Sequence, residues 1–305
     1  MKKNCLIIGF GSIGARHADV LKNMGHEVHV VSRRRTREYK SFQDIPGAFR
    51  AFEYGYAVIC TPTSDHYQAA VQLYENGFKG SLLVEKPLYE KPGYLPLPSA
   101  AVHVGYNLRF HPILKEIRRL IQGKKLYSMH VYCGQYLPFW RKDRDYRNTY
   151  SASVKSGGGV LRDLSHELDY VCRLTGKWKK VAAKGGRVSS LEIDSEDLFC
   201  LLMETQDCPA VSLQVNYLDL NTKREIILNG AGLSLKADLV GGTLEVNGHK
   251  SVYTVEKDDT YRDQHLDILL KKGETACSYE EGIEIVNLIE AVFKASREGI
   301  WVNRN

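Results

Sequence analysis

The chain has 305 residues, of which 43% are hydrophobic and 26% charged, and its formal net charge is +6. This length suits two domains, each with its own core, and the composition is typical of a globular protein. No apolar run approaches the roughly 20 residues that cross a bilayer, so we expect no membrane partner. The apolar stretch Cys5–Ile8 is too short for a signal peptide and leads straight into a glycine turn.

Seven cysteines are scattered along the chain without any CxxC pair. Cys5 and Cys60 lie inside apolar segments, where a thiol packs as a small hydrophobe. The odd number and irregular spacing argue against a disulfide framework or a zinc site. We therefore expect a cytoplasmic protein that holds no metal.

The one dense basic run in the sequence is Arg33-Arg34-Arg35-Thr36-Arg37. It is short, and no aromatic side chains accompany it as a platform on which bases could stack. We therefore expect no nucleic-acid partner.

The most informative motif is the sequence Gly-Phe-Gly-Ser-Ile-Gly, which follows the apolar run Asn4–Ile8 and opens a helical pattern from Ile13 to about Met24. In a dinucleotide-binding βαβ unit the first glycine makes the tight turn, the second lets the backbone approach a pyrophosphate, and the third lets helix and strand pack closely. The free N–H groups at the helix start then face the phosphates. We expect cofactor contacts from Gly9, Phe10, Gly11, Ser12, Ile13 and Gly14.

The first hundred residues alternate between short apolar segments and helical patterns. This rhythm predicts a doubly wound parallel sheet covered on both faces, and an α/β domain over residues 1–110. Its expected strands are Leu6–Ile8, Val28–Val31, Ala57–Cys60, Leu82–Val84 and Val102–Val104.

The rhythm changes after Pro112 and predicts a second, α+β domain over residues 111–305. A helix over Ile113–Ile121 precedes a long strand, and a triple-glycine turn opens a helix that ends near Leu174. Strand patterns separated by turn residues then predict a large, open, mostly antiparallel sheet. They cover Val181–Val188, Leu198–Glu204, Ala210–Tyr217, Arg224–Asn229, Leu233–Ala237, Thr243–Val246 and Ser251–Val255. Two helices close the chain, the second behind a capping box from Ser278 to Glu281.

Three further motifs carry candidate chemistry. The turn Thr61–His66 follows one parallel strand, and Glu85-Lys86-Pro87 follows the next, so both lie at the carboxyl edge where such sheets bind ligands. A fixed ammonium such as that of Lys86 stabilises the oxygen of an alcohol that is losing a hydride. The triple-glycine turn presents His166, and a neutral imidazole is a suitable proton acceptor. The turn Thr61–His66 alone is equally consistent with a plain structural role, and an isolated lysine or histidine is more often structural.

Taken together, five motifs in order resemble the Gfo/Idh/MocA oxidoreductase family, over nearly the whole chain. They are GFGSIGARH, TPTSDH, EKP, the segment Gly105–Pro112, and GGGxxxDxxHxxD from Gly157 to Asp169. The resemblance implies a Rossmann domain that binds NAD(P) and a second domain whose open sheet forms a homodimer or homotetramer. It also implies redox chemistry on a sugar or a related polyol.

Carried over by position, the resemblance makes Lys86 the catalytic lysine and His166 the catalytic histidine. It places Asn107 and Arg109 in the segment that lines the substrate site. Many members have an aspartate four residues before the histidine, whereas Asp163 stands three before it, so the catalytic role of Asp163 is left open. Thr61, Pro62, His66 and Glu85 are expected near the cofactor with Lys86.

The end of the second strand decides between NAD and NADP. An acidic residue there binds the adenosine ribose, but this chain has Ser32-Arg33-Arg34, which suits a 2′-phosphate. We therefore expect NADP(H), with NAD(H) as the alternative.

The segment Gly134–Tyr150 mixes aromatic residues with arginines and precedes the His166 helix. Aromatic faces suit a sugar ring, and arginines suit phosphate or carboxylate groups. We expect substrate contacts from Trp140 and Tyr146, alongside Lys86, Asp163 and His166. The segment resembles that of relatives in surface-polysaccharide and nonulosonic acid pathways, so the expected substrate is a sugar derivative or nucleotide sugar. A non-catalytic regulator of the same fold and an imine or biliverdin-type reductase remain alternatives.

Overall fold

The computed structural model describes residues 2–33, 36–94, 101–141 and 144–304. Its contacts divide the chain into two compact units. The first unit contains the residues up to Phe110 together with Glu256–Val286, and the second contains His111–Val255 together with the residues from Asn287 onward. The sequence pattern assigned residues 111–305 to one domain, whereas the structure groups the segment Glu256–Val286 with the first unit.

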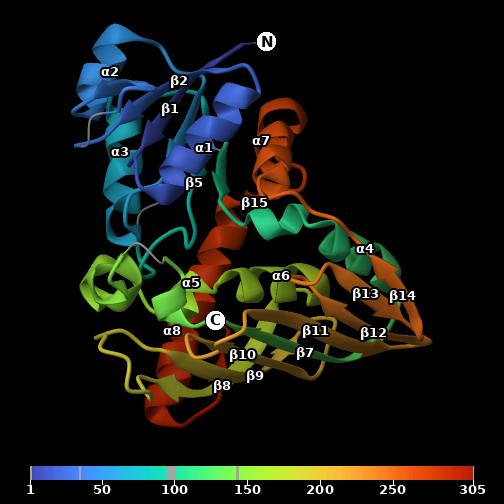
Figure 1. Cartoon of the computed structure of the whole chain (residues 1–305). Helices are drawn as coiled ribbons and strands as arrows, with labels where there is room; N and C mark the ends of the chain where they lie inside the picture. Colours follow the sequence, from blue (N-terminus) through green and yellow to red (C-terminus); the bar gives the residue numbers. More distant parts are fainter. Residues whose placement is uncertain (1, 34–35, 95–100, 142–143, 305) are drawn as a thin grey trace. The chain divides into compact units, whose positions relative to one another are not determined.

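The first unit is built on a seven-stranded sheet in the order β15-β6-β5-β4-β1-β2-β3, parallel except for β15. In Figure 1 this sheet lies between α3 on one side and α1 and α7 on the other. The strands are β1 (Asn4–Ile8), β2 (Glu27–Val31), β3 (Lys40–Phe42), β4 (Tyr56–Ile59), β5 (Ser81–Val84), β6 (Val102–Val104) and β15 (Cys277–Ser278).

Continuous burial explains why these short apolar segments form central strands. Every residue of β4 is buried, as are three of the four residues of β5. Strands covered on both faces have no polar face, which is why their sequences show no alternation. The expected Rossmann-type sheet is confirmed. The strand β3 and the helix α2 (Ile45–Ala51) were not predicted, although Asp44 caps α2 by accepting a hydrogen bond from the Gly47 N–H at 2.7 Å.

The second unit is built on a nine-stranded sheet in the order β14-β13-β12-β11-β7-β10-β9-β8-β16. Only β10 and β7 pair in parallel, so the mostly antiparallel sheet is confirmed. In Figure 1, α5 and α6 lie along one face of this sheet. The strands are β7 (Leu126–Gly134), β8 (Trp178–Gly186), β9 (Leu198–Thr205), β10 (Val211–Asn216), β11 (Lys223–Gly230), β12 (Leu233–Asp238), β13 (Thr243–Val246), β14 (His249–Val252) and β16 (Val302–Asn303).

Apart from α2, the helices follow the expected pattern with one exception. The helix expected from the triple-glycine turn to near Leu174 is broken at Leu164 and Ser165, so His166 begins a new helix. The capping box is confirmed, since the Glu281 N–H donates to Ser278 Oγ and the Ser278 N–H donates to Glu281 Oε2. The helices are α1 (Ser12–Asn23), α3 (His66–Glu75), α4 (Pro112–Ile121), α5 (Val160–Asp163), α6 (His166–Thr175), α7 (Asp259–Lys271) and α8 (Tyr279–Glu298).

Across the described residues, every helix is too short or too polar to serve as a membrane span.

A buried ion pair fixes α6 on the sheet of the second unit. The Glu167 side chain is fully buried, and its Oε1 accepts a hydrogen bond from Arg224 Nε on β11 at 2.8 Å. Removing one partner of such a pair leaves the other charge buried without compensation. The pair therefore sets the position of the helix that begins at His166.

We expect Arg224→Met to lower the free energy of unfolding by about 3 kcal/mol, because it leaves the buried Glu167 carboxyl without its partner. The matched control is Lys180→Met, which removes an exposed pair with Glu204 and should change stability by less than about 1 kcal/mol. Urea unfolding followed by circular dichroism measures both. Equal losses of stability in the two variants would contradict the role of the Glu167–Arg224 pair in fixing α6.

Candidate active site

The glycine turn after β1 has the three properties that a pyrophosphate cradle needs. Gly9 has a φ of +91°, and a Cβ there would lie 2.7 Å from the backbone of Cys60. A Cβ on Gly14 would lie 2.0 Å from the Gly9 carbonyl oxygen, so α1 packs directly on the turn. Around Gly11, in contrast, a Cβ would meet nothing within 4 Å. The turn is therefore tight on its protein side and open where a phosphate would approach.

The end of β2 lies beside this turn, since the Gly9 N–H donates to the Val31 carbonyl at 3.0 Å. Ser32 follows Val31 and donates its N–H to the Phe42 carbonyl of β3. The side chain of Arg33 is exposed, whereas Arg34 lies outside the described residues. The end of β2 thus carries the hydroxyl of Ser32 and the guanidinium of Arg33 at the place where an acidic residue would bind a ribose.

His66 lies on the far side of the same edge, at the start of α3. It is buried, and its ring nitrogens lie 3.1–3.2 Å from the backbone carbonyl oxygens of Thr61, Pro87 and Leu88. Burial lowers its pKa more than these hydrogen bonds raise it. His66 therefore braces the backbone that follows Lys86, while the cofactor contacts expected of Thr61, Pro62 and His66 stay predictions.

Glu85 and Lys86 follow β5, next to the end of β4. The Glu85 N–H donates to the Ile59 carbonyl, and Glu85 Oε2 accepts the Lys86 N–H at 3.2 Å. Burial alone would raise the pKa of the Glu85 carboxyl, but the hydrogen bond from His17 and the positive charge of Lys86 act against it, and the pKa is lowered. A carboxylate therefore lies directly behind the half-buried Lys86 side chain.

Asn107 and Arg109 lie on a 3-10 turn (Asn107–Phe110) of the first unit and are both buried. Asn107 Nδ2 donates to Thr260 Oγ1 at 2.7 Å, and Arg109 Nη1 pairs with Glu281 at 2.6 Å. Both partners belong to the returning segment Glu256–Val286, and nothing local in the sequence indicates these pairs. The substrate contacts expected of Asn107 and Arg109 stay predictions.

In the second unit, the triple-glycine turn lets α5 begin in close contact with the neighbouring backbone. A Cβ on Gly158 would lie 2.1 Å from the Tyr150 carbonyl, and Gly159 has a φ of +115°. Asp163 at the end of α5 is buried, and its carboxylate accepts hydrogen bonds from the hydroxyls of Tyr150 and Tyr217. The structure thus brings Asp163 together with two tyrosines, three residues before His166.

The aromatic segment after β7 joins this cluster. The ring of Trp140 packs edge-on against Tyr217 with centroids 5.2 Å apart, and its Nε1 donates to the Gln135 carbonyl at 3.3 Å. Tyr146 begins the 3-10 turn Tyr146–Asn148, and its hydroxyl accepts the Glu192 N–H. Trp140 therefore lies beside Tyr217, the tyrosine that donates to Asp163, while the substrate contacts expected of Trp140 and Tyr146 stay predictions.

Glu196 is a titratable group of this cluster that the sequence pattern did not indicate. Its carboxyl lies against Gly159, where a Cβ would meet Glu196 Oε1 at 2.2 Å. Burial is the main cause that raises its pKa to about 7, with a smaller contribution from the charge of Asp163. Only the fold brings Glu196, which lies in the loop before β9, to the start of α5.

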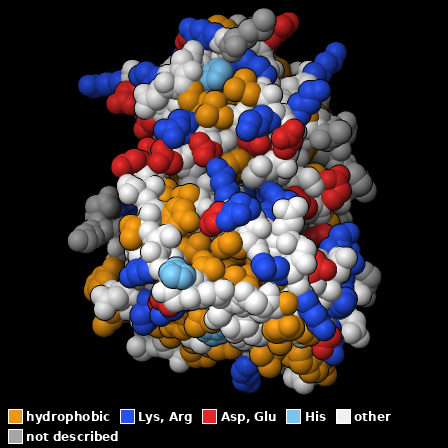
Figure 2. All heavy atoms as spheres, turned by 90° about the vertical axis from the view of Figure 1, so that its right-hand side faces the viewer, with side chains coloured by type: hydrophobic (Ala, Val, Ile, Leu, Met, Phe, Trp, Pro, Cys, Tyr) orange, Lys and Arg blue, Asp and Glu red, His pale blue; other side chains and the backbone are white. Residues whose placement is uncertain are grey.

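The described residues contain no group of three or more His, Cys, Asp or Glu side chains arranged to hold a metal ion. On the face shown in Figure 2, Lys and Arg side chains are interspersed with Asp and Glu side chains.

Comparison with protein-family models gives two matches. Residues 3–94 match the model of an oxidoreductase family with an NAD-binding Rossmann fold, and residues 114–252 match the GFO/IDH/MocA C-terminal domain. The chain belongs to the Gfo/Idh/MocA family. The expected membership is thereby confirmed, and this Gfo/Idh/MocA protein pairs a nicotinamide-type Rossmann unit with the family's second domain. No curated protein matches it.

Several solved structures share this fold over the full chain. The structure of GenD2 from gentamicin A biosynthesis in complex with NAD is 21% identical, with a TM-score of 0.82 over 100% of this chain and 97% of that one. Levoglucosan dehydrogenase with NADH and levoglucosan is 15% identical, with a TM-score of 0.85 over 100% of both chains. The WlbA dehydrogenase from Bordetella pertussis, with NADH and UDP-GlcNAcA, is 16% identical, with a TM-score of 0.79 over 100% and 98%.

We expect Gly11→Ala to leave the fold intact but to weaken NADH and NADPH binding by about tenfold or more, because its Cβ would occupy the space that a pyrophosphate approaches. Gly14→Ala should instead lower the melting temperature, because its Cβ meets the Gly9 carbonyl oxygen. Nicotinamide fluorescence titration and thermal unfolding separate the two effects. Wild-type cofactor affinity in Gly11→Ala would contradict the cradle.

Proposed function

We propose that this protein transfers a hydride between NADP(H) and a carbon that bears a hydroxyl or ketone on a sugar derivative or nucleotide sugar. The observation that carries the proposal is the edge of the parallel sheet. There, the open glycine turn, the Ser32–Arg33 strand end and Lys86 follow β1, β2 and β5 of one unit. Ligands of doubly wound sheets bind at this edge.

The bound nicotinamide supplies a hydride acceptor or donor. In the oxidative direction, a nicotinamide held at the glycine turn would accept the hydride, and the neutral imidazole of His166 takes the proton of the substrate hydroxyl. The Lys86 ammonium donates a hydrogen bond to the substrate oxygen and stabilises the negative charge that develops there. Asp163 orients the aromatic cluster through Tyr150 and Tyr217. The reductive direction reverses these steps.

The choice of NADP(H) rests on the end of β2. Ser32 offers a hydroxyl and Arg33 an exposed guanidinium, and a charged fork of this kind recognises a phosphate group. Arg34 follows in the sequence and is proposed for the same contact.

The substrate class rests on Trp140 and Tyr146, which belong to a segment that also carries several arginines. Aromatic faces bind the C–H face of a sugar, and arginines bind anionic groups. Relatives of the same fold were solved with levoglucosan and with UDP-GlcNAcA. We therefore propose an anionic or nucleotide-linked sugar, and a role in surface-polysaccharide or nonulosonic acid metabolism in the cytoplasm.

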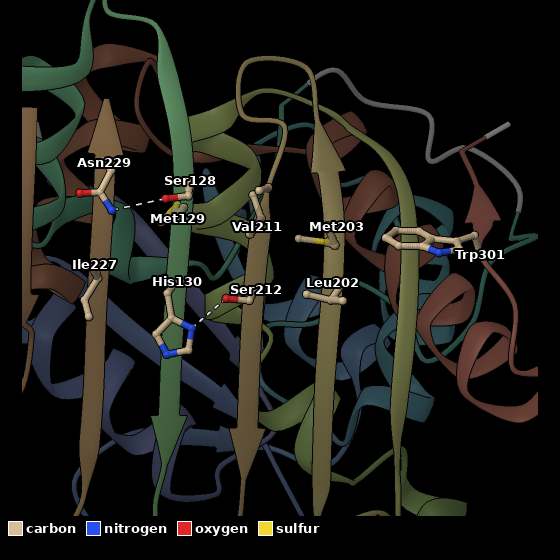
Figure 3. Close-up of a pocket in the computed structure, with 11 residues that line it drawn as sticks. Ser128, Met129, His130, Leu202, Met203, Val211, Ser212, Ile227, Asn229 and Trp301 are labelled. Atoms are coloured by element: carbon tan, nitrogen blue, oxygen red, sulfur yellow. Dashed lines mark hydrogen bonds between the residues drawn. The ribbon is translucent and has the colours of Figure 1, made fainter. Parts of the chain in front are cut away.

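The open face of the nine-stranded sheet supports the proposed homodimer or homotetramer. It exposes large apolar side chains, among them Leu202, Ile227 and Trp301, around a hollow of about 490 Å³. Figure 3 shows Ile227 on β11 and Leu202 on β9, on either side of the hydrogen-bonded pair of His130 and Ser212, with Trp301 just before β16. An apolar face of this kind on a sheet is typical of an interaction surface.

Lys86→Met should lower the turnover number by about 100-fold, because it removes the group that stabilises charge on the substrate oxygen. Its affinity for NADPH should stay near that of the wild type. A screen of sugars and nucleotide sugars, followed by absorbance of the reduced cofactor, first identifies a substrate for the wild-type enzyme. Lys79→Met, which changes an exposed lysine of the same unit, is the control. Wild-type rates for Lys86→Met would refute the mechanism.

Arg33→Ala should weaken NADPH binding by about tenfold, the usual effect of losing one charge-assisted hydrogen bond, and leave NADH binding unchanged. Ser32→Asp should favour NADH, because a carboxylate repels the 2′-phosphate and accepts from ribose hydroxyls. Arg50→Ala, at an exposed arginine of α2, is the control. Fluorescence titration with both cofactors measures the ratio, and a wild-type preference for NADH would overturn the choice of NADP(H).

A further inference from the structure

A continuous chain of hydrogen bonds runs through the interior of the first unit and ends at Lys86. The Tyr56 hydroxyl on β4 lies 2.8 Å from His265 Nδ1 on α7, and His265 Nε2 lies 2.9 Å from His17 Nδ1 on α1. His17 Nε2 lies 2.9 Å from Glu85 Oε1, and Glu85 Oε2 accepts the backbone N–H of Lys86. β4, α7, α1 and the end of β5 are distant in sequence, and these hydrogen bonds bring them together next to Lys86.

Every group in this chain of hydrogen bonds is satisfied when all the donors point in one direction, from Tyr56 towards Glu85. Tyr56 donates to His265, His265 donates from Nε2 to His17, and His17 donates from Nε2 to the Glu85 carboxylate. In this arrangement both imidazoles are neutral, with the proton on Nε2. Burial lowers the pKa of His265 well below its usual value and raises the pKa of Tyr56, which suits a neutral imidazole and a donating phenol.

The four side chains joined by these hydrogen bonds are buried. Tyr56, His17 and His265 are each 0% exposed, and Glu85 is 8% exposed. A buried carboxylate without hydrogen-bond donors is costly, so Glu85 depends on its partners to stay ionised. The protein also leaves room for this carboxylate, since a Cβ on Gly105 would lie 2.8 Å from Glu85 Oε1.

We propose that His17 and His265 are positioning residues that hold Glu85 as an ionised carboxylate behind Lys86, and so fix the place and the charge environment of the reacting ammonium. The proposal rests on the function proposed above for Lys86. It extends the active site to α7, a helix that follows the strands of the second unit in sequence but packs in the first unit.

Other titratable groups also face Glu85 from the surrounding elements. Burial is the main cause that raises the pKa of Tyr261 on α7 and of Cys60 after β4 and lowers the pKa of His66 on α3, and the charge of Glu85 makes a smaller, raising contribution at all three. Among the hydrogen bonds described, however, its carboxylate accepts one side-chain donor, His17, and one backbone donor, Lys86. Loss of the His17 donor should therefore raise the pKa of Glu85.

The direct test is the titration of Glu85 in the full-length protein labelled with ¹³C at the glutamate carboxyl, with Glu85→Gln assigning the signal. The wild-type signal should stay that of a carboxylate to lower pH than in His17→Leu. In His17→Gln the amide N–H can replace the Nε2–H donor, so the titration should return toward the wild-type curve. ¹⁵N spectra should show both imidazoles protonated at Nε2.

The activity arm uses the sugar that gives turnover in the wild-type screen. His17→Leu, His265→Leu and Glu85→Gln should each lower the turnover number by about tenfold, as expected for losing a hydrogen bond to a charged group, with little change in NADPH affinity. The acidic limb of the His17→Leu profile should move to higher pH. His29→Leu is the matched control, since His29 is also buried and hydrogen-bonded to a tyrosine, Tyr54, at 3.0 Å.

The outcomes separate this proposal from the one on which it rests. If Lys86→Met keeps wild-type turnover, the proposed function fails, and the positioning role of His17 and His265 fails with it. If Lys86→Met is inactive but His265→Leu behaves like His29→Leu, only the positioning role fails. An unchanged Glu85 titration in His17→Leu would overturn it as well.

Discussion

The constraint on which the first unit depends is the burial of one carboxylate. Placing Glu85 in the interior costs free energy that only donors and a nearby positive charge can offset. The fold meets this requirement with His17 from α1, with His265 behind it from the returning segment, and with the backbone of Lys86 itself. Supporting that one charge therefore ties α1, α7 and the backbone of Lys86 together.

The second unit applies the same principle around a different acid. Asp163 is held by two tyrosine hydroxyls, and Trp140 packs against one of those tyrosines. The buried Glu167 pairs with Arg224, and this pair fixes the helix that begins at His166. Both units thus keep their candidate reactive side chain half-exposed while the neighbouring residue in the sequence, Glu85 or Glu167, is buried.

Local patterns in the sequence were sufficient for the sheets, the glycine turn and the capping box at Ser278, because each depends on residues within one turn or strand. They could not predict that Glu256–Val286 packs in the first unit, because His265 and Thr260 find their partners more than 150 residues away. The break before His166 and the buried Glu196 depend likewise on packing between elements. The sequence therefore predicts the candidate motifs but not the residues that support them.

The central claim is that Lys86 and His166 act on the same substrate in one transition state. The most direct test is a kinetic cycle of Lys86→Met, His166→Asn and the double variant, on the sugar that the wild-type enzyme oxidises. Groups that act as a unit are strongly non-additive, so the account predicts that the double variant is about as slow as the slower single variant. Losses that multiply independently, or a single variant with wild-type turnover, would contradict it.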